Sequence, residues 1–225
     1  MKTLVQLIGM LMSMFIMACD TDPILGQSPE PPSDDISIKS RSTVYNPITD
    51  KITGNSELSR RENSIAVIFE AYELMPGHAY SLWWRVWNRP ELCEIPGKCS
   101  EKDLVNVKSL QVEMMFAGNA VADSDGRIHI LSHLEAGDDS GSVNYMHGWY
   151  PAGGLHDDKT FSAEVDLILR SHGPYDKDIM EDQAGSYDLG CIYPLGFLPF
   201  TEIPDKPGEC GDIAIAIHAP VQQVN

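Results

Sequence analysis

Two histidines in the segment RIHILSH, His129 and His133, are four residues apart. On a helix this spacing would place both rings on one face, where they could bind one metal ion. On a strand the two rings also share a face, but at about 3.3 Å per residue they lie about 13 Å apart. The residues around them favour a strand, so a local metal-binding pair is excluded.

A metal site assembled from different strands stays open, and its best candidates are His133 and His172. Each lies near the end of an expected strand and is followed by loop-like sequence. Imidazole nitrogen is a ligand that suits copper and zinc. The sequence requires no cofactor, but it allows copper or zinc at such a site. The alternative is that both are ordinary surface or hydrogen-bonded histidines.

The segment RSHGPYDKDIMEDQAG, residues 170–185, is the most distinctive expected loop. Arg170 and His172 share a strand face, and Gly173-Pro174 is expected to turn the chain before four acidic residues: Asp176, Asp178, Glu181 and Asp182. A histidine and carboxylates at a loop mouth could bind a metal or transfer protons. The alternative is that Arg170 pairs with a carboxylate and that the loop is a solvated connection.

A third candidate is aromatic. In HAYSLWWRVWN, residues 78–88, Trp83, Arg85 and Trp87 share one face of a strand, while Trp84 lies on the other. If the first face is exposed, it could bind a sugar or a peptide. The alternative is that both faces are covered, with the segment between Cys93 and Cys99 lying over the tryptophans.

The motifs of common catalytic sites are missing from the sequence. There is no G-x-S-x-G nucleophile motif, no phosphate-binding P-loop and no G-x-G-x-x-G. We therefore assign no catalytic residue; a role other than that of an enzyme is favoured, and enzymatic activity stays an open alternative.

Four of the five cysteines, Cys93, Cys99, Cys191 and Cys210, lie in the body of the chain. An even number in an exported chain predicts two disulfides, for which sequence alone allows three pairings. We favour Cys93–Cys99 and Cys191–Cys210, because each closes a loop containing Pro and Gly. Loop-closure entropy then contributes about 2 and 3 kcal/mol respectively. A zinc site is the alternative, but the spacing matches no common zinc ribbon.

The N-terminus predicts export and an anchor. Lys2 precedes an apolar stretch that is too short to span a membrane, and Ala18 precedes Cys19. Residues 16–19, IMAC, resemble the lipobox of bacterial lipoproteins. That resemblance implies a signal peptide over 1–18, lipid on Cys19 and a location in the cell envelope facing the periplasm or exterior. An ordinary secretory signal is the alternative.

Residues 19–37, which follow, are rich in Pro, Asp and Ser and are predicted to form a flexible acidic tether. The whole chain carries a formal charge of −17, with 16 Lys and Arg against 33 Asp and Glu. Such a charge repels nucleic acid, which we exclude as a partner. The expected partners are the membrane, through the lipid, and a protein or a glycan.

Short strands dominate from Ile38 onward. Runs rich in β-branched and aromatic residues occupy 64–72, 78–88, 162–172 and 212–220, and two further runs flank the hairpin-type turn DSDG at 123–126. In the last run Ile213, Ile215 and Ile217 are expected on one face. No long segment has helical periodicity. These signals predict one all-β domain over 38–225, an antiparallel Greek-key β-sandwich.

One motif refines this prediction. Leu74, Pro76 and Tyr80 fit the pattern L-x-P-G-x-x-Y, which resembles the tyrosine corner of Greek-key sandwiches. In that motif the Tyr hydroxyl bonds to backbone a few residues upstream and fixes a crossover between sheets. The motif bears on the fold and assigns no activity.

Several segments together resemble a group of exported bacterial β-sandwich proteins without assigned activity. The shared features are the Trp-rich strand, the paired cysteines after Asn-x-Pro, and Arg-Ser-His-Gly-Pro at 170–174. The resemblance implies an exported, disulfide-bearing domain and lends no catalytic residues. The leading prediction is thus a lipid-anchored, non-catalytic binding module. The alternatives are metal binding or a metal-dependent activity through histidines from different strands, and carbohydrate binding through the Trp face.

Overall fold

The computed structural model describes residues 37–179, 185–187, 191, 206 and 208–221. They belong to one compact unit that begins at Asp35. The strands are β1 (Ile38–Tyr45), β2 (Ile52–Arg60), β3 (Ser64–Ala71), β4 (His78–Trp87), β5 (Val112–Val121), β6 (Ile128–Glu135), β7 (Glu164–Pro174) and β8 (Gly211–His218). The helices are short: η1 (Pro90–Leu92), η2 (Glu101–Asn106), α1 (Val107–Leu110) and η3 (Asn144–His147). No described helix has the length and apolar character needed to cross a membrane.

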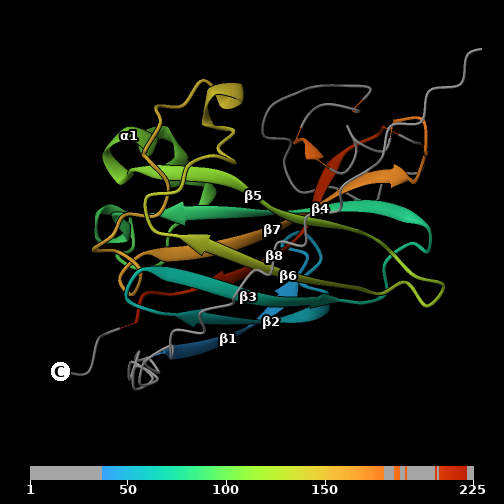
Figure 1. Ribbon diagram of the computed structural model, residues 1–225, viewed down its shortest axis with the longest axis horizontal. Coiled ribbons are helices and arrows are strands. Elements are labelled where there is room, and N and C mark those ends of the chain that lie inside the picture. The colour runs from blue at the N-terminus through green and yellow to red at the C-terminus, as the bar shows by residue number, and fades with distance from the viewer. Residues whose placement is uncertain (1–36, 180–184, 188–190, 192–205, 207, 222–225) are drawn as a thin grey trace, which may run out of the picture. The chain divides into compact units, whose positions relative to one another are not determined.

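All eight strands form one antiparallel sheet in the order β5-β4-β7-β8-β1-β2-β3-β6 (Figure 1). The two end strands, β5 and β6, also contact each other, so the sheet curls into a nearly closed barrel. Around this barrel β3, β6, β5 and β4 are neighbours in that order, which is a Greek-key arrangement. The prediction of an all-β, antiparallel Greek-key fold is confirmed.

Alternation of side chains builds the core. On β7, Val165, Leu167 and Leu169 point inward, and they pack with Trp84 of β4 and Phe69 of β3 in one buried cluster. The two halves of the sheet, β5-β4-β7-β8 and β1-β2-β3-β6, therefore share one core as the layers of a sandwich do.

One detail of the last strand differs from prediction. Ile215 and Ile217 pack on the outer side of the sheet, but Ile213 lies in the inner core. The ladder between β7 and β8 shifts register here, because Leu169 pairs with Ala214 whereas Arg170 pairs with Asp212. The extra residue reverses the facing of Ile213.

The predicted tyrosine-corner residues lie at the turn into β4. The buried Tyr80 hydroxyl accepts a hydrogen bond of 3.2 Å from the backbone N–H of Met75. Burial raises the pKa of Tyr80 to about 12, so the hydroxyl keeps its proton. The turn between β5 and β6 packs here too. Gly126 has a φ of +68° and lies so close to the Leu74 carbonyl that no Cβ would fit.

Candidate functional site

The outer face of β4, β7 and β8 carries polar groups that are nevertheless buried. The connections around η1, η2, α1 and η3 cover part of it, and the segment containing Tyr187 covers another part. We call this surface the covered face. Its residues are Ser81, Trp83, Arg85 and Trp87 from β4, Asp166, Ile168, Arg170 and His172 from β7, and Asp212 from β8, each no more than 2% exposed.

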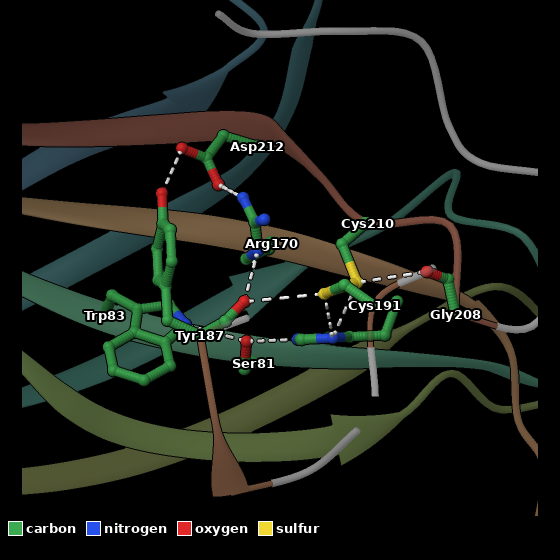
Figure 2. A network of polar contacts seen from close by, with 9 residues as sticks. Ser81, Trp83, Arg170, Tyr187, Cys191, Gly208, Cys210 and Asp212 are labelled. Carbon is green, nitrogen blue, oxygen red and sulfur yellow. Dashed lines mark hydrogen bonds and ion pairs between the residues drawn. A yellow bond between two sulfur atoms is a disulfide. The ribbon is translucent and has the colours of Figure 1, made fainter. Parts of the chain in front are cut away.

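An arginine network occupies the centre of this face (Figure 2). Arg170 Nη1 donates to Asp212 Oδ1 at 2.8 Å, and Arg170 Nε donates to the Tyr187 carbonyl at 2.8 Å. The Tyr187 hydroxyl donates to the second oxygen of Asp212 at 2.7 Å. The sequence-based alternative that Arg170 pairs with a carboxylate is thus confirmed. Because both charges are buried, each depends on the other.

A second buried pair lies further along β4 and β7. Arg85 Nε donates to Asp166 Oδ2 at 2.9 Å, and the indole N–H of Trp87 donates to the same oxygen at 2.8 Å. Trp87 also packs against Cys93 and Cys99. Tryptophan is here a buried hydrogen-bond donor rather than a contact surface.

Of the two interpretations of this strand, the one in which both faces are covered is confirmed, and the hypothesis of an exposed platform of Trp83, Arg85 and Trp87 is wrong. Trp83 and Trp87 have no exposed surface and Arg85 is 2% exposed. Trp83 makes edge-to-face contacts with Phe116 and Tyr187, with ring centroids 5.4 and 5.0 Å apart. The covering loops, including the Cys93–Cys99 segment over Trp87, leave no platform for a sugar ring.

His172 lies beside the second disulfide. Both predicted disulfides, Cys93–Cys99 and Cys191–Cys210, are present. His172 Nδ1 is 3.3 Å from Cys210 Sγ and 4.0 Å from Cys191 Sγ. Its other ring nitrogen, Nε2, is 2.7 Å from the Ser81 hydroxyl, which accepts the Trp83 indole N–H at 2.7 Å. Burial, with a smaller effect from Arg170, lowers the pKa of His172 to about 3, so the ring is neutral.

The predicted metal pair of His133 and His172 is not formed. His133 lies on the outer side of β6, with 52% of its side chain exposed and Glu135 as its neighbour at 3.5 Å. His172 lies on β7, and β6 and β7 are not adjacent in the sheet. Among the described residues, the group that could hold a metal is instead His172, Cys191 and Cys210, whose donor atoms lie within 4.8 Å of one another.

The sequence places His172 at the start of a loop, but the structure places it within a strand. β7 continues through Gly173 to Pro174, so His172 lies within a strand and is buried. Asp176 and Asp178 follow the strand; Asp176 is half-buried and Asp178 is exposed. Glu181 and Asp182 lie outside the described residues. No described carboxylate joins the His172 group, so the hypothesis that His172 acts together with Asp176 or Asp178 is wrong. For Glu181 and Asp182 it stays a prediction.

A buried carboxyl lies at the other end of β7. Glu164 has no exposed surface, and its Oε1 accepts the backbone N–H of Cys99 at 2.8 Å. Its Oε2 has no hydrogen-bond partner among the described residues. Burial, together with the nearby negative charge of Asp166, raises the pKa of Glu164 to about 7. This carboxyl therefore titrates near neutral pH.

Sequence reasoning missed Ser81, Tyr187 and Asp212 as members of the site. Ser81 could have been found, because period-two alternation places it on the same face as Trp83. Asp212 and Tyr187 reach Arg170 only through pairing of β7 with β8 and through the folding of the connection between them. Local sequence carries no signal for that proximity.

Comparisons with known proteins give a distant likeness. No protein-family model matches the chain, and no curated protein matches it. Among solved structures, a SOD-like protein from Bacillus subtilis matches with 14% identity and a TM-score of 0.31, over 80% of this chain and 97% of that one. A mutant and a double mutant of a SOD-like protein from the same organism match with 13% identity and TM-scores of 0.32 and 0.33, each over 81% and 97% of the two chains. No residue of the site is assigned from them.

Proposed function

We propose that this chain is a lipid-anchored protein of the bacterial cell envelope and acts as a non-catalytic binding module. Two features support the location: the lipobox-like sequence ending at Cys19, and two disulfides, which persist in oxidising compartments outside the cytosol. Two or more acyl chains anchor a protein stably, whereas one chain binds only marginally.

The observation that carries the binding proposal is the outer side of β1, β2, β3 and β6, which we call the open face. It presents Arg41, Thr43, Glu57, Ile68, Glu70 and Leu131, and a shallow hollow of about 500 Å³ lies over β1, β2 and β3. Ile68 and Leu131 are register partners and are 43% and 66% exposed, so they form an apolar spot beside the hollow. Exposed apolar groups with a polar rim are typical of interaction sites.

The partner that fits this face is a polypeptide with positively charged residues. Glu57 and Glu70 line the hollow, and Glu57 forms ion pairs with Lys39 and Arg41 at 2.7 and 2.9 Å. The chain as a whole carries −17. Long-range attraction of this kind accelerates the approach of a cationic partner and is weakened by salt.

Cross-linking in intact cells tests the binding surface. A photo-reactive amino acid at Leu131 should give a discrete, salt-sensitive protein adduct that is lost in an Ile68→Asp background. The same amino acid at Val105, which is 85% exposed on η2, should not give this adduct. Identical adducts from both positions, or none from position 131, would contradict the proposal.

Anchoring is tested separately through Cys19. Cys19→Ala should move the protein from the membrane fraction to the soluble envelope fraction, because the lipid has no other attachment point. If the variant stays in the membrane fraction after a high-salt wash, the lipid-anchor proposal is wrong.

Binding of copper or zinc is a second candidate function, favoured by the His172, Cys191 and Cys210 group. One imidazole nitrogen and two thiolates are a ligand set that suits either ion. Anaerobic titration of the thiol-reduced protein with Zn(II) or Cu(I) tests it. One ion should bind per chain, and His172→Ala should weaken binding while His133→Ala leaves it unchanged. Absence of binding by the reduced protein would rule this function out.

A further inference from the structure

We infer that the Cys191–Cys210 disulfide is the closed state of a metal centre, and that reduction opens it for one thiophilic ion. His172 Nδ1 and the two cysteine thiolates would hold the ion, Cu(I) or Zn(II). The inference rests on the second proposed function and adds the condition under which the ion binds. Oxidised protein carries the disulfide and no ion, and reduced protein carries the ion.

The donor spacing supports this ligand set. Zn–S and Zn–N bonds of about 2.3 and 2.0 Å place tetrahedral donors about 3.6 Å apart. His172 Nδ1 is 3.3 and 4.0 Å from the two sulfurs, so the imidazole already lies at a ligand's distance from both. Only the two sulfurs, which are bonded to each other, are too close. Breaking that bond lets them separate to about 3.7 Å, the spacing around one ion.

The histidine is held in the orientation that a ligand needs. Its Nδ1 faces the sulfurs, and its Nε2 lies 2.7 Å from the Ser81 hydroxyl. When Nδ1 binds a metal, Nε2 carries the proton, and this N–H donates a hydrogen bond to the Ser81 hydroxyl oxygen. Metal-bound histidines usually donate their second N–H to such an outer partner, which fixes the ring and tautomer. Trp83 donates to the same hydroxyl and holds it in place.

The reduced, metal-free state has hydrogen-bond acceptors for its thiols. Cys191 Sγ is 3.6 Å from the Tyr187 carbonyl, and Cys210 Sγ is 3.6 Å from the Gly208 carbonyl (Figure 2). Disulfide sulfurs carry no proton to donate. Two S–H groups could donate to these carbonyls, so the surroundings suit the dithiol as well as the disulfide.

The two disulfides differ in access, and this makes the switch selective. Cys191 and Cys210 are half-buried. Cys93 and Cys99 are 5% and 8% exposed and pack against Trp87. A reducing thiolate must reach a sulfur in order to attack it. Cys191 and Cys210, the more accessible pair and the pair beside a histidine, are therefore reduced first.

The chemistry requires a dithiol reductant, for which an exported dithiol protein or a small dithiol would serve. Its thiolate attacks one sulfur, the Cys191–Cys210 bond breaks, and a mixed disulfide forms. Its second thiol then attacks the mixed disulfide and displaces the cysteine that is still bonded to the reductant, so two electrons and two protons pass to this chain and the reductant leaves as a disulfide. Metal binding then releases the two thiol protons. A disulfide oxidant reverses the electron transfer and ejects the ion.

The test uses the mature, detergent-solubilised protein. Reduced protein should bind one Zn(II) or Cu(I), measured by competition with a chromophoric chelator, and separate titrations identify the preferred ion. Co(II) should give thiolate-to-metal charge-transfer bands. Affinity should fall about 100-fold in His172→Ala and about 10-fold in Ser81→Ala. His133→Ala and the Cys93→Ser/Cys99→Ser variant should bind like the parent chain.

Oxidation of the loaded protein separates the inference from the function on which it rests. Addition of a disulfide oxidant should release the ion in proportion to Cys191–Cys210 formed, as followed by mass spectrometry of alkylated peptides. If reduced protein binds no ion, both the metal function and the gating are wrong. If oxidised protein binds as tightly as reduced protein, only the gating is wrong. Loss of binding in the Cys93→Ser/Cys99→Ser variant, with binding kept in Cys191→Ser/Cys210→Ser, would place the site elsewhere.

Discussion

Outward-facing side chains are exposed on one half of the sheet and buried on the other. On the open face, Ile68 of β3 and Leu131 of β6 contact solvent. On the covered face, Ile168 and Arg170 of β7 are buried under connections between strands. Both halves obey the same period-two alternation, so the difference comes from the loops. Charges on the covered face must be paired, whereas charges on the open face remain hydrated.

The largest expected difference between the halves concerns arginine. Arg170→Met leaves Asp212 buried without its cation, and we expect a loss of about 3–5 kcal/mol in the free energy of unfolding. Arg41→Met removes an arginine that is 86% exposed and should cost less than about 1 kcal/mol. Urea unfolding at fixed pH measures both. Equal losses in the two variants would remove the energetic distinction between the faces.

Isoleucine gives a matched pair on the outer side of the sheet. Ile168 is 1% exposed and Ile68 is 43% exposed. Ile168→Ala should lower the free energy of unfolding by about 3 kcal/mol, because it leaves a cavity beneath the loops. Ile68→Ala should change it by less than about 1 kcal/mol. A small effect at position 168 would mean that the cover over β7 packs loosely.

Glu164 predicts a pH dependence. Its pKa is raised to about 7 in the folded chain, above the ordinary value of 4.5. Between pH 4.5 and pH 7 the folded chain therefore keeps a proton on this carboxyl that the unfolded chain loses. The stability that this adds is complete below pH 4.5 and is lost as the pH rises through 7. Glu164→Gln does not titrate, and its stability relative to the parent chain should rise by about 3 kcal/mol from pH 4 to pH 8.

The control for this titration is Glu135→Gln, on the open side of β6, where the side chain is 55% exposed. Because the side chain is exposed, its unfolding free energy should differ from that of the parent chain by less than about 0.5 kcal/mol. If the Glu164→Gln curve also runs parallel to the parent curve, the carboxyl does not retain its proton on folding.

The smallest expected effect is spectroscopic. Trp83, Trp84 and Trp87 have no exposed surface, whereas Trp149 is half-buried. Acrylamide should therefore quench mainly Trp149, and Trp149→Phe should remove most of the quenchable emission. Added oligosaccharides should leave the emission maximum unchanged. A sugar-induced shift that survives in Trp149→Phe would show that the covered tryptophans are reachable.

Prediction from sequence succeeded where strands are strongly apolar. The runs at 64–72, 78–88 and 162–172 match β3, β4 and β7 to within two residues at each end. β1 and β2 were not delimited, because IKSRSTVY and ITGNSELSR place polar residues on a hydrated face and carry few core residues. The disulfide pairing was predictable because both pairs are close in sequence and close short loops.

The sequence by itself determined the alternation of side chains, hence an all-β chain in which His129 and His133 cannot bind one ion together. It also determined two disulfides. Only the tertiary structure decided that Trp83 and Trp87 are covered, and that His172 meets two cysteines rather than His133. The physical reason is the separation along the sequence of the residues that interact. Alternation is fixed by backbone geometry between neighbouring residues, whereas burial of an outward face depends on loops and strand pairings that join residues far apart in the chain.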